Sequence, residues 1–177
     1  MLNQVGTAKK PATAAQSGLR WLWLGVIFLI IDQVTKLWVA ANFELFETVA
    51  VIPMFSFTYV HNEGAAFSFL GSAGGWQRWF FTAIAVVISS LLLYWMRALD
   101  KSEKLLAIAY SLVLSGAIGN LIDRVSYGYV IDFIHLYYES YQWPVFNVAD
   151  ISICVGAGLI IFEAITAKDK TDDKLAK

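Results

Sequence analysis

Charged residues are scarce in this chain. Lys, Arg, Asp and Glu together make up 15% of its 177 residues, whereas an ordinary soluble domain contains roughly 25%. The formal net charge is −1, and no block of basic residues offers a surface for nucleic acid. The one cysteine, Cys154, excludes an internal disulfide and lies in an apolar run, so we interpret it as a small packing residue.

Apolar residues, by contrast, are abundant. They make up 58% of the chain, and the mean hydropathy is +0.60. A soluble domain of this size cannot usually bury so much apolar surface, because much of its chain must face water. A bilayer removes that limit, so we expect a single integral membrane domain that spans 1–177.

Four segments are long and apolar enough to cross the hydrocarbon layer as helices, which takes about 20 residues each. They are 19–41, 79–96, 105–122 and 145–167. The loops 42–78 and 125–144 are the long connections, and the tails 1–18 and 168–177 are expected to be flexible. The predicted fold class is a helical membrane protein with four transmembrane helices.

Basic residues indicate the orientation, because cytoplasmic loops collect Lys and Arg. Ten of the 13 basic residues lie before the first helix, around the loop between the second and third helices, or after the fourth. Both termini are therefore expected in the cytoplasm, and the loops 42–78 and 125–144 on the outer side. In the first of these loops, the alternating stretch 54–60 predicts a β-strand. The aromatic residues of the second loop suit the lipid headgroup level.

Polar side chains collect at the outer ends of the predicted helices. Because charged groups inside a bilayer are costly, they face a cavity or a partner and mark a functional site. The spacing of Asn120 and Arg124, and that of Asn147 and Asp150, places each pair on one helical face. With Asp32 in the outer half of the first helix and Asp132 in the second outer loop, the sequence predicts a compact polar pocket that opens outward.

Carboxyl groups in such a pocket indicate general acid–base catalysis. Two that lie close together and poorly solvated share one proton, so one can take a proton from water while the other protonates a carbonyl oxygen. Spacing alone does not select the pair among Asp32, Asp123, Asp132 and Asp150. Intramembrane acids also mark ion paths, so a small membrane transporter is the alternative, and a structural or assembly protein is a third.

Five patches resemble the bacterial lipoprotein signal peptidase family, also called signal peptidase II. They are 32–36 (DQVTK), 62–67 (NEGAAF), 116–124 (GAIGNLIDR), 130–133 (VIDF) and 146–150 (FNVAD). They occur in the order of the family and between the expected helices. One patch alone is a weak signal, but five in order on this topology are specific. The resemblance covers about 32–151 and leaves the tails outside.

The resemblance implies an intramembrane aspartyl endopeptidase with a catalytic pair formed by Asp132 and Asp150. It also implies that a set of polar side chains binds the substrate backbone and that another set supports the site. The binding set is Asn62, Asn120, Arg124 and Asn147, and the supporting set is Asp32, Lys36, Gly64 and Asp123. The family also shares a small β-sheet cradle and a short helix on the outer surface, which would correspond to the two outer loops.

The implied substrate is a prolipoprotein whose signal peptide is removed just before a diacylglyceryl-modified cysteine. Membrane lipids are the other expected partners, with no nucleic acid, and we expect a monomer in the bacterial cytoplasmic (inner) membrane with its active site near the outer, periplasmic face. No cofactor is expected. His61 and His135 are not spaced as metal ligands, no HExxH motif is present, and no Gly-x-Ser-x-Gly stretch indicates a serine nucleophile.

Overall fold

The computed structural model describes residues 16–64 and 74–175, with side chains described up to Thr166. Its long helices are α1 Leu22–Asn42, α2 Trp76–Ala98, α3 Lys104–Ser126 and α4 Val148–Leu175, and a short 3₁₀ turn, Gly18–Trp21, leads into α1. Each of the four is long and apolar enough to cross a membrane. The prediction of four transmembrane helices is therefore confirmed.

The limits of the fourth helix differ from those predicted. It begins at Val148 rather than 145, because the Asn147 side chain caps it by accepting a hydrogen bond from the Asp150 backbone N–H at 2.9 Å. It also continues to Leu175, so the tail predicted to be flexible from 168 is helical over most of its length. The tail contains Ala, Lys and Leu, which favour helix even outside the apolar span. The tail 1–15 lies outside the described residues.

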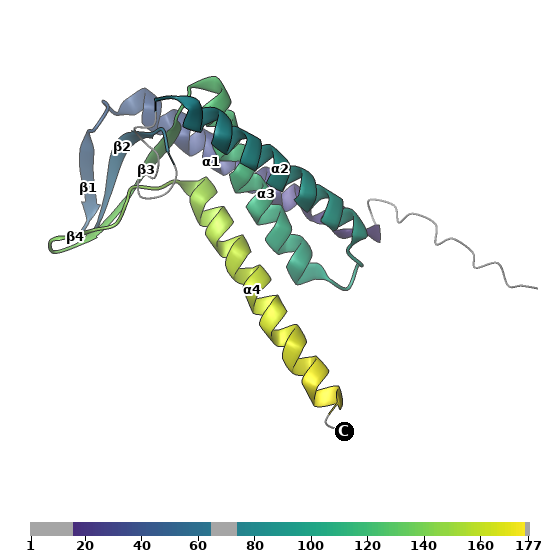
Figure 1. Ribbon diagram of the computed structural model, residues 1–177. Helices are drawn as coiled ribbons and strands as arrows, with labels where there is room; N and C mark the ends of the chain where they lie inside the picture. Colours follow the sequence, from purple (N-terminus) through teal and green to yellow (C-terminus); the bar gives the residue numbers. More distant parts are fainter. Residues whose placement is uncertain (1–15, 65–73, 176–177) are drawn as a thin grey trace, which may run out of the picture.

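Helix α3 packs against each of the other three helices (Figure 1). Small residues allow this close approach, since a Cβ on Gly116 would clash with the Ala149 carbonyl oxygen of α4, and one on Gly156 would lie 2.7 Å from the Ala109 carbonyl oxygen of α3. Further along, α4 leans away from the bundle, and a Cβ added to Gly158 would have no neighbouring atom of the described residues within 4 Å. The tight contact is thus confined to the half of α4 nearer the site.

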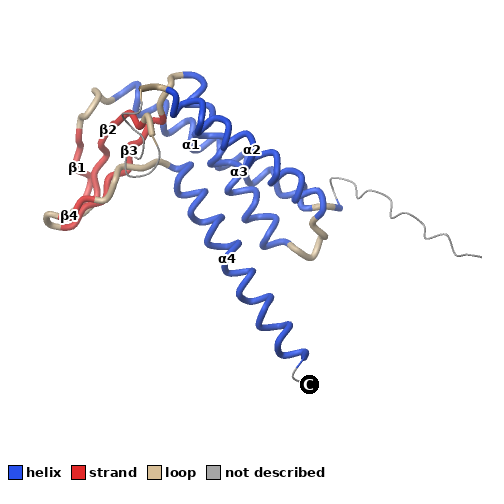
Figure 2. Tube along the Cα trace, viewed as in Figure 1, coloured by secondary structure: helices blue, strands red, loops and turns tan. Residues whose placement is uncertain are grey.

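An antiparallel four-stranded sheet lies at one end of the helices (Figure 2). Its strands, in the order β1-β2-β3-β4, are Thr48–Ile52, Phe55–Asn62, Val130–Tyr138 and Tyr141–Gln142. The strand predicted at 54–60 lies in β2. Both outer loops contribute, as the family resemblance implied. The described residues of these loops contain no short helix, and 65–73 of the first loop lie outside the description.

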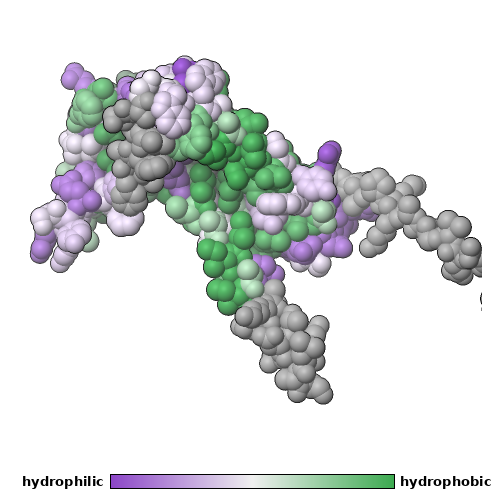
Figure 3. All heavy atoms as spheres, viewed as in Figure 1, coloured by the Kyte–Doolittle hydropathy of each residue, from purple (hydrophilic) through white to green (hydrophobic). Residues whose placement is uncertain are grey.

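The sheet is anchored to the helices by a small apolar core. Val39 of α1 packs there with Tyr59 of β2 and with Ile131 and Phe133 of β3. This contact fixes β3 against the C-terminal end of α1, and the side of β3 that carries Asp132 then faces α3 and α4. Elsewhere the helices expose large apolar side chains, which gather over the helical part of the face in Figure 3, as expected for a surface that lipid covers.

The close contact of α3 with α4 makes a prediction for two glycines. Gly116→Ala forces a Cβ against the Ala149 carbonyl oxygen, so we expect it to destabilise the protein by about 1–3 kcal/mol. Gly158→Ala is the matched control, because a Cβ there meets nothing, and it should leave stability unchanged or slightly raised. Thermal unfolding of both variants in detergent measures the difference. Equal midpoints for the two would contradict this account of the packing.

Candidate active site

Asp132 is a buried carboxyl group on β3, only 1% exposed. Its two oxygens accept hydrogen bonds from two amide side chains, Asn62 Nδ2 at 2.9 Å and Asn147 Nδ2 at 2.6 Å. Asn62 is available because the antiparallel register of β2 with β3 pairs it with Val130, two residues from Asp132. One donor thus comes from the sheet and the other from the start of α4.

Asp150 is the second carboxyl group, half-buried in the first turn of α4. It forms a reciprocal cap with Asn147, because its carboxylate accepts the Asn147 backbone N–H at 3.2 Å while the Asn147 side chain accepts the Asp150 backbone N–H. Its other oxygen accepts Asn120 Nδ2 of α3 at 2.9 Å. Asn147 therefore contacts both carboxyl groups and ties them to one helix terminus.

Behind these groups lies a buried ion network. Lys36 of α1, 1% exposed, places its ammonium 2.9 Å from a carboxylate oxygen of Asp32 and 2.9 Å from one of Asp123 on α3. Its third partner is Asn120 Oδ1, also at 2.9 Å. Each of the three N–H groups of the ammonium thus has one acceptor, so the ammonium needs no water as a partner. Asp123 thus pairs with Lys36 and, through its Oδ2, with the Ile131 backbone N–H at 3.1 Å.

The network also reaches the other elements of the site. Asp32 Oδ1 accepts the backbone N–H of Ala149, in the first turn of α4, at 2.8 Å. Negative charge is favourable there because the helix N-terminus carries unpaired donors and a positive partial charge. Gly119 allows the approach, since a Cβ on it would lie 2.5 Å from Asp32 Oδ2.

Gln33 is a site residue that sequence reasoning missed. Its Nε2 lies 3.1 Å from Asp32 Oδ2, 3.1 Å from Asp123 Oδ1 and 3.2 Å from the Gly119 carbonyl oxygen. The available signal was its position beside Asp32 in a membrane span, where an amide also needs partners. The backbone donors of Ala149 and Ile131 had no signal in the sequence, because every residue type other than proline has that group.

Arg124 lies at the C-terminal end of α3, 8% exposed, over the ring of Phe81 at 5.1 Å. Its guanidinium donates to the Gly64 carbonyl oxygen at 2.9 Å and to the Asn120 carbonyl oxygen at 3.5 Å. Its Nε has no hydrogen-bond partner among the described residues. Arg124 therefore brings a buried cation to the site and holds the chain that follows Asn62.

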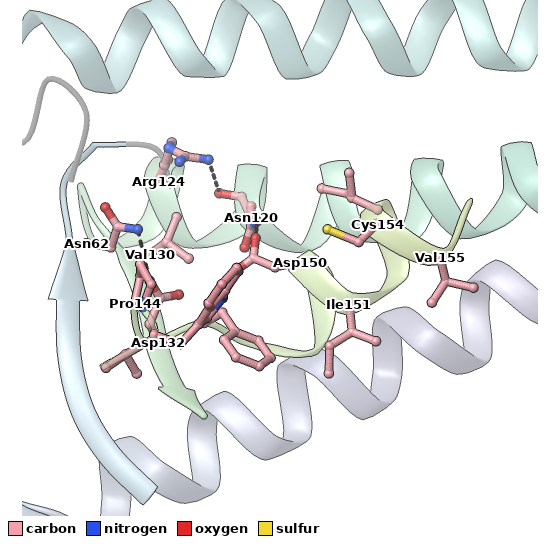
Figure 4. A pocket seen from close by; sticks show the side chains of 14 residues that line it. Asn62, Asn120, Arg124, Val130, Asp132, Pro144, Asp150, Ile151, Cys154 and Val155 are labelled. Atoms are coloured by element: carbon pink, nitrogen blue, oxygen red, sulfur yellow. Dashed lines mark hydrogen bonds between the residues drawn. The ribbon is translucent and has the colours of Figure 1, made fainter. Parts of the chain in front are cut away.

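A cavity of about 500 Å³ opens at these groups (Figure 4). Its polar wall consists of Asn62, Asn120, Arg124, Asp132 and Asp150. Its other walls are mostly apolar and come from the segment between β4 and α4 and from the first turns of α4. They include Trp143, Pro144, Val145, Phe146, Ile151 and Val155. The cavity therefore joins two carboxyl groups to an apolar groove along α4.

The surroundings of Asp132 favour its protonated form. Burial, and next the nearby carboxyl group of Asp150, raise the pKa of Asp132 to about 7 from the usual 3.8. The amide donors of Asn62 and Asn147, and the charge of Lys36, act in the opposite direction but are smaller. At neutral pH a large fraction of Asp132 thus carries a proton. Among the described residues, no group of three or more His, Cys, Asp or Glu could hold a metal ion.

The structure brings every residue of the predicted site into one connected cluster. Asp132, Asp150 and the predicted binding residues line or border the cavity, while Asp32, Lys36 and Asp123 lie behind it. Gly64 contacts Arg124 through its carbonyl oxygen. The amides of Asn62, Asn120 and Asn147 hold the two carboxyl groups, a role that the sequence did not indicate. Their part in binding substrate stays a prediction.

Comparisons with known proteins agree with this geometry. The family model described as signal peptidase (SPase) II matches residues 24–166. The lipoprotein signal peptidase of Pseudoalteromonas translucida (strain TAC 125) is 53% identical over 161 residues, which cover 91% of this chain and 97% of the relative. That of Shewanella woodyi (strain ATCC 51908 / MS32) is 55% identical over 155 residues, 88% of each chain.

Solved structures resemble the fold. A bacterial membrane enzyme determined by the in meso method at 2.3 Å resolution has a TM-score of 0.79 and 32% sequence identity. The match covers 93% of this chain and 96% of that one. A second bacterial membrane enzyme, determined by the same method at 1.9 Å, gives a TM-score of 0.73 at 32% identity, over 89% of this chain and 97% of that one. Like its relatives, the chain is a multi-pass protein of a bacterial membrane.

The ion network behind the cavity makes a prediction for stability. Lys36→Met leaves Asp32 and Asp123 buried without a cation, so we expect the free energy of unfolding to fall by about 3–5 kcal/mol. The triple variant Asp32→Asn/Lys36→Met/Asp123→Asn, here called the neutral-network variant, should recover much of that loss. Thermal unfolding in detergent tests both. A Lys36→Met protein as stable as the parent would contradict the assigned network.

Proposed function

The chain belongs to the signal peptidase II family, and we propose that Asp132 and Asp150 form the catalytic pair with which it removes signal peptides from prolipoproteins. Members of this family are aspartic peptidases, so the reaction needs two carboxyl groups in opposite protonation states. The observation that carries the assignment is the position of Asn147, which hydrogen-bonds to both carboxyl groups at the edge of one cavity.

The environments of the two groups support a division of roles. Asp132 is the acid, because burial and the second carboxyl group favour its protonated form. Asp150, half-buried and more accessible from the cavity, is the base. It takes a proton from water, whose oxygen bonds to the scissile carbonyl carbon while Asp132 protonates the carbonyl oxygen. The resulting diol returns a proton to Asp132 as the C–N bond breaks, and Asp150 protonates the leaving nitrogen.

The shape of the cavity supports a lipid-modified substrate. Its apolar wall along Ile151 and Val155 continues from the carboxyl groups into the span of α4. An apolar signal peptide can lie there while the diacylglyceryl chains of the modified cysteine remain in the bilayer. Cleavage then falls just before that cysteine, at the carboxyl pair. Donors to the substrate backbone come from the site asparagines and from Arg124, whose Nε has no hydrogen-bond partner within the described part of the chain.

The proposed topology has both termini in the cytoplasm and the site near the outer face of the cytoplasmic membrane. The distribution of basic residues supports it, because ten of the 13 lie before the first span, around the connection between α2 and α3, or after the fourth span. The chain acts as one integral membrane domain and as a monomer, since every group of the proposed pair and of its hydrogen-bond partners comes from one chain. A transporter is less compatible with the cavity, whose wall along α4 is apolar rather than a polar path.

The catalytic pair is tested by removing one carboxyl charge at a time. Asp132→Asn and Asp150→Asn each keep the size of the side chain but cannot exchange a proton, so each should lower kcat by at least about 10³-fold. The assay is cleavage of a diacylglyceryl-modified prolipoprotein by purified protein in detergent. Glu139→Gln, which changes an exposed carboxylate in the turn between β3 and β4, is the control and should cleave normally. Normal cleavage by either aspartate variant would overturn the assignment.

The protonated state of Asp132 predicts a pH dependence. Because the acid form is required and its pKa is about 7, kcat/KM should decline as the pH rises through about 7. Asn62→Ala removes a hydrogen bond that stabilises the charged form, so the decline should move to higher pH. Initial rates between pH 5 and 9 measure both midpoints. A decline that moves to lower pH in Asn62→Ala would refute the role of Asp132 as the acid.

A further inference from the structure

Lys36 has a relation to the catalytic pair that goes beyond neutralising two aspartates. One of its three hydrogen-bond partners is neither Asp32 nor Asp123 but the neutral side chain of Asn120, at 2.9 Å. Lys36 does not contact Asp150. Asn120, however, contacts both, because its Oδ1 accepts from Lys36 and its Nδ2 donates to Asp150 Oδ1 at 2.9 Å.

The chemistry of the ammonium group decides how this amide is oriented. An ammonium only donates hydrogen bonds, so the oxygen of Asn120 must face Lys36. The nitrogen then faces Asp150, where it can only donate. A second donor supports the same orientation, because Asn147 Nδ2 lies 3.2 Å from Asn120 Oδ1. Without Lys36 the amide could turn over and present its oxygen to Asp150, which would repel an ionised carboxylate.

The charge on Lys36 adds to the effect of orientation. A cation at Oδ1 polarises the amide and strengthens its N–H as a donor, and such chains of hydrogen bonds reinforce one another in a low-dielectric interior. Lys36 and Asn120 are 1% and 8% exposed, so little water screens the chain. Asp132 lacks a link of this kind, because its two amide donors belong to Asn62 and Asn147, neither of which hydrogen-bonds to Lys36, and the charge of Lys36 acts on it only through space.

We propose that Lys36 is a positioning residue that acts through the Asn120 amide to hold Asp150 as an ionised hydrogen-bond acceptor, ready to take a proton from water. The inference rests on the proposed role of Asp150 as the base. It assigns to Lys36 an effect on the rate of the chemical step, separate from its part in stability. Lys36 is 1% exposed and does not line the cavity, so KM should not depend on it.

A double-mutant cycle tests this connection. Because Lys36→Met alone is expected to be strongly destabilised, the cycle uses the neutral-network variant, Asn120→Ala, and the two combined. The neutral-network variant and Asn120→Ala should each lower kcat at saturating substrate by about tenfold or more, the loss expected for one charge-assisted hydrogen bond. If Lys36 acts through Asn120, the combined variant should lose about as much as Asn120→Ala alone, because the effects are coupled. KM should stay within about threefold in the neutral-network variant, because Lys36 does not line the cavity.

Ser111→Ala is the matched control. Ser111 is also fully buried and also joins α3 to the start of α1, by accepting from the Gly25 backbone N–H at 3.0 Å and donating to the Trp21 carbonyl oxygen at 2.9 Å. Its contacts do not lead to Asp150. The variant should lower the unfolding midpoint but leave kcat, and the effect of Asn120→Ala on kcat, unchanged.

The possible outcomes separate the inference from its premise. Losses of kcat that multiply in the combined variant would show that Lys36 does not act through Asn120 and would overturn the proposal. So would a rise in KM without a fall in kcat in the neutral-network variant, since it would mean that the network acts on substrate binding rather than on the chemical step. Activity retained by Asp150→Asn would instead refute the role of Asp150 as the base. The prolipoprotein cleavage assay of that variant measures this separately.

Discussion

The ammonium of Lys36, held between Asp32 and Asp123, is the interaction on which the rest of the structure depends. It joins α1 to α3 inside the membrane span, where a charge without a partner is costly. Asp32 also accepts a hydrogen bond from the backbone in the first turn of α4, through its other oxygen. Asp123 also accepts one from the backbone of β3. The elements α1, α3, α4 and β3 are therefore connected through one cation. Two of them, α4 and β3, carry the carboxyl groups that line the cavity.

The sequence predicts the helices and the candidate carboxyl groups well, because each has a local signal. Twenty apolar residues in a row have few other structures available, and an aspartate inside such a run needs a reason to be there. The resemblance to a known family then selects Asp132 and Asp150, a choice that spacing did not make. The strand that carries Asp132 was not indicated by pattern alone, although its aromatic and β-branched residues are typical of one.

What the sequence does not provide is the pairing between elements. That Asn147 bridges the carboxyl groups depends on the register of β3 and on the point where α4 begins, and both are set by contacts distant in sequence. The same holds for Gly116 and Gly119, whose missing side chains matter only because Ala149 and Asp32 occupy that space. The role of such a glycine is visible only in the folded structure, because the glycine acts by leaving space for a group from a neighbouring helix.

The cap at the start of α4 has a consequence for how the protein is made. Asn147 and Asp150 satisfy each other only when the first turn of α4 has formed, and Asn147 reaches Asp132 from that turn. Under the proposed catalytic pair, a nascent chain in which α1, α2 and α3 have inserted but α4 has not holds Asp132 without Asp150 beside it. Such an incompletely inserted chain would therefore be inactive.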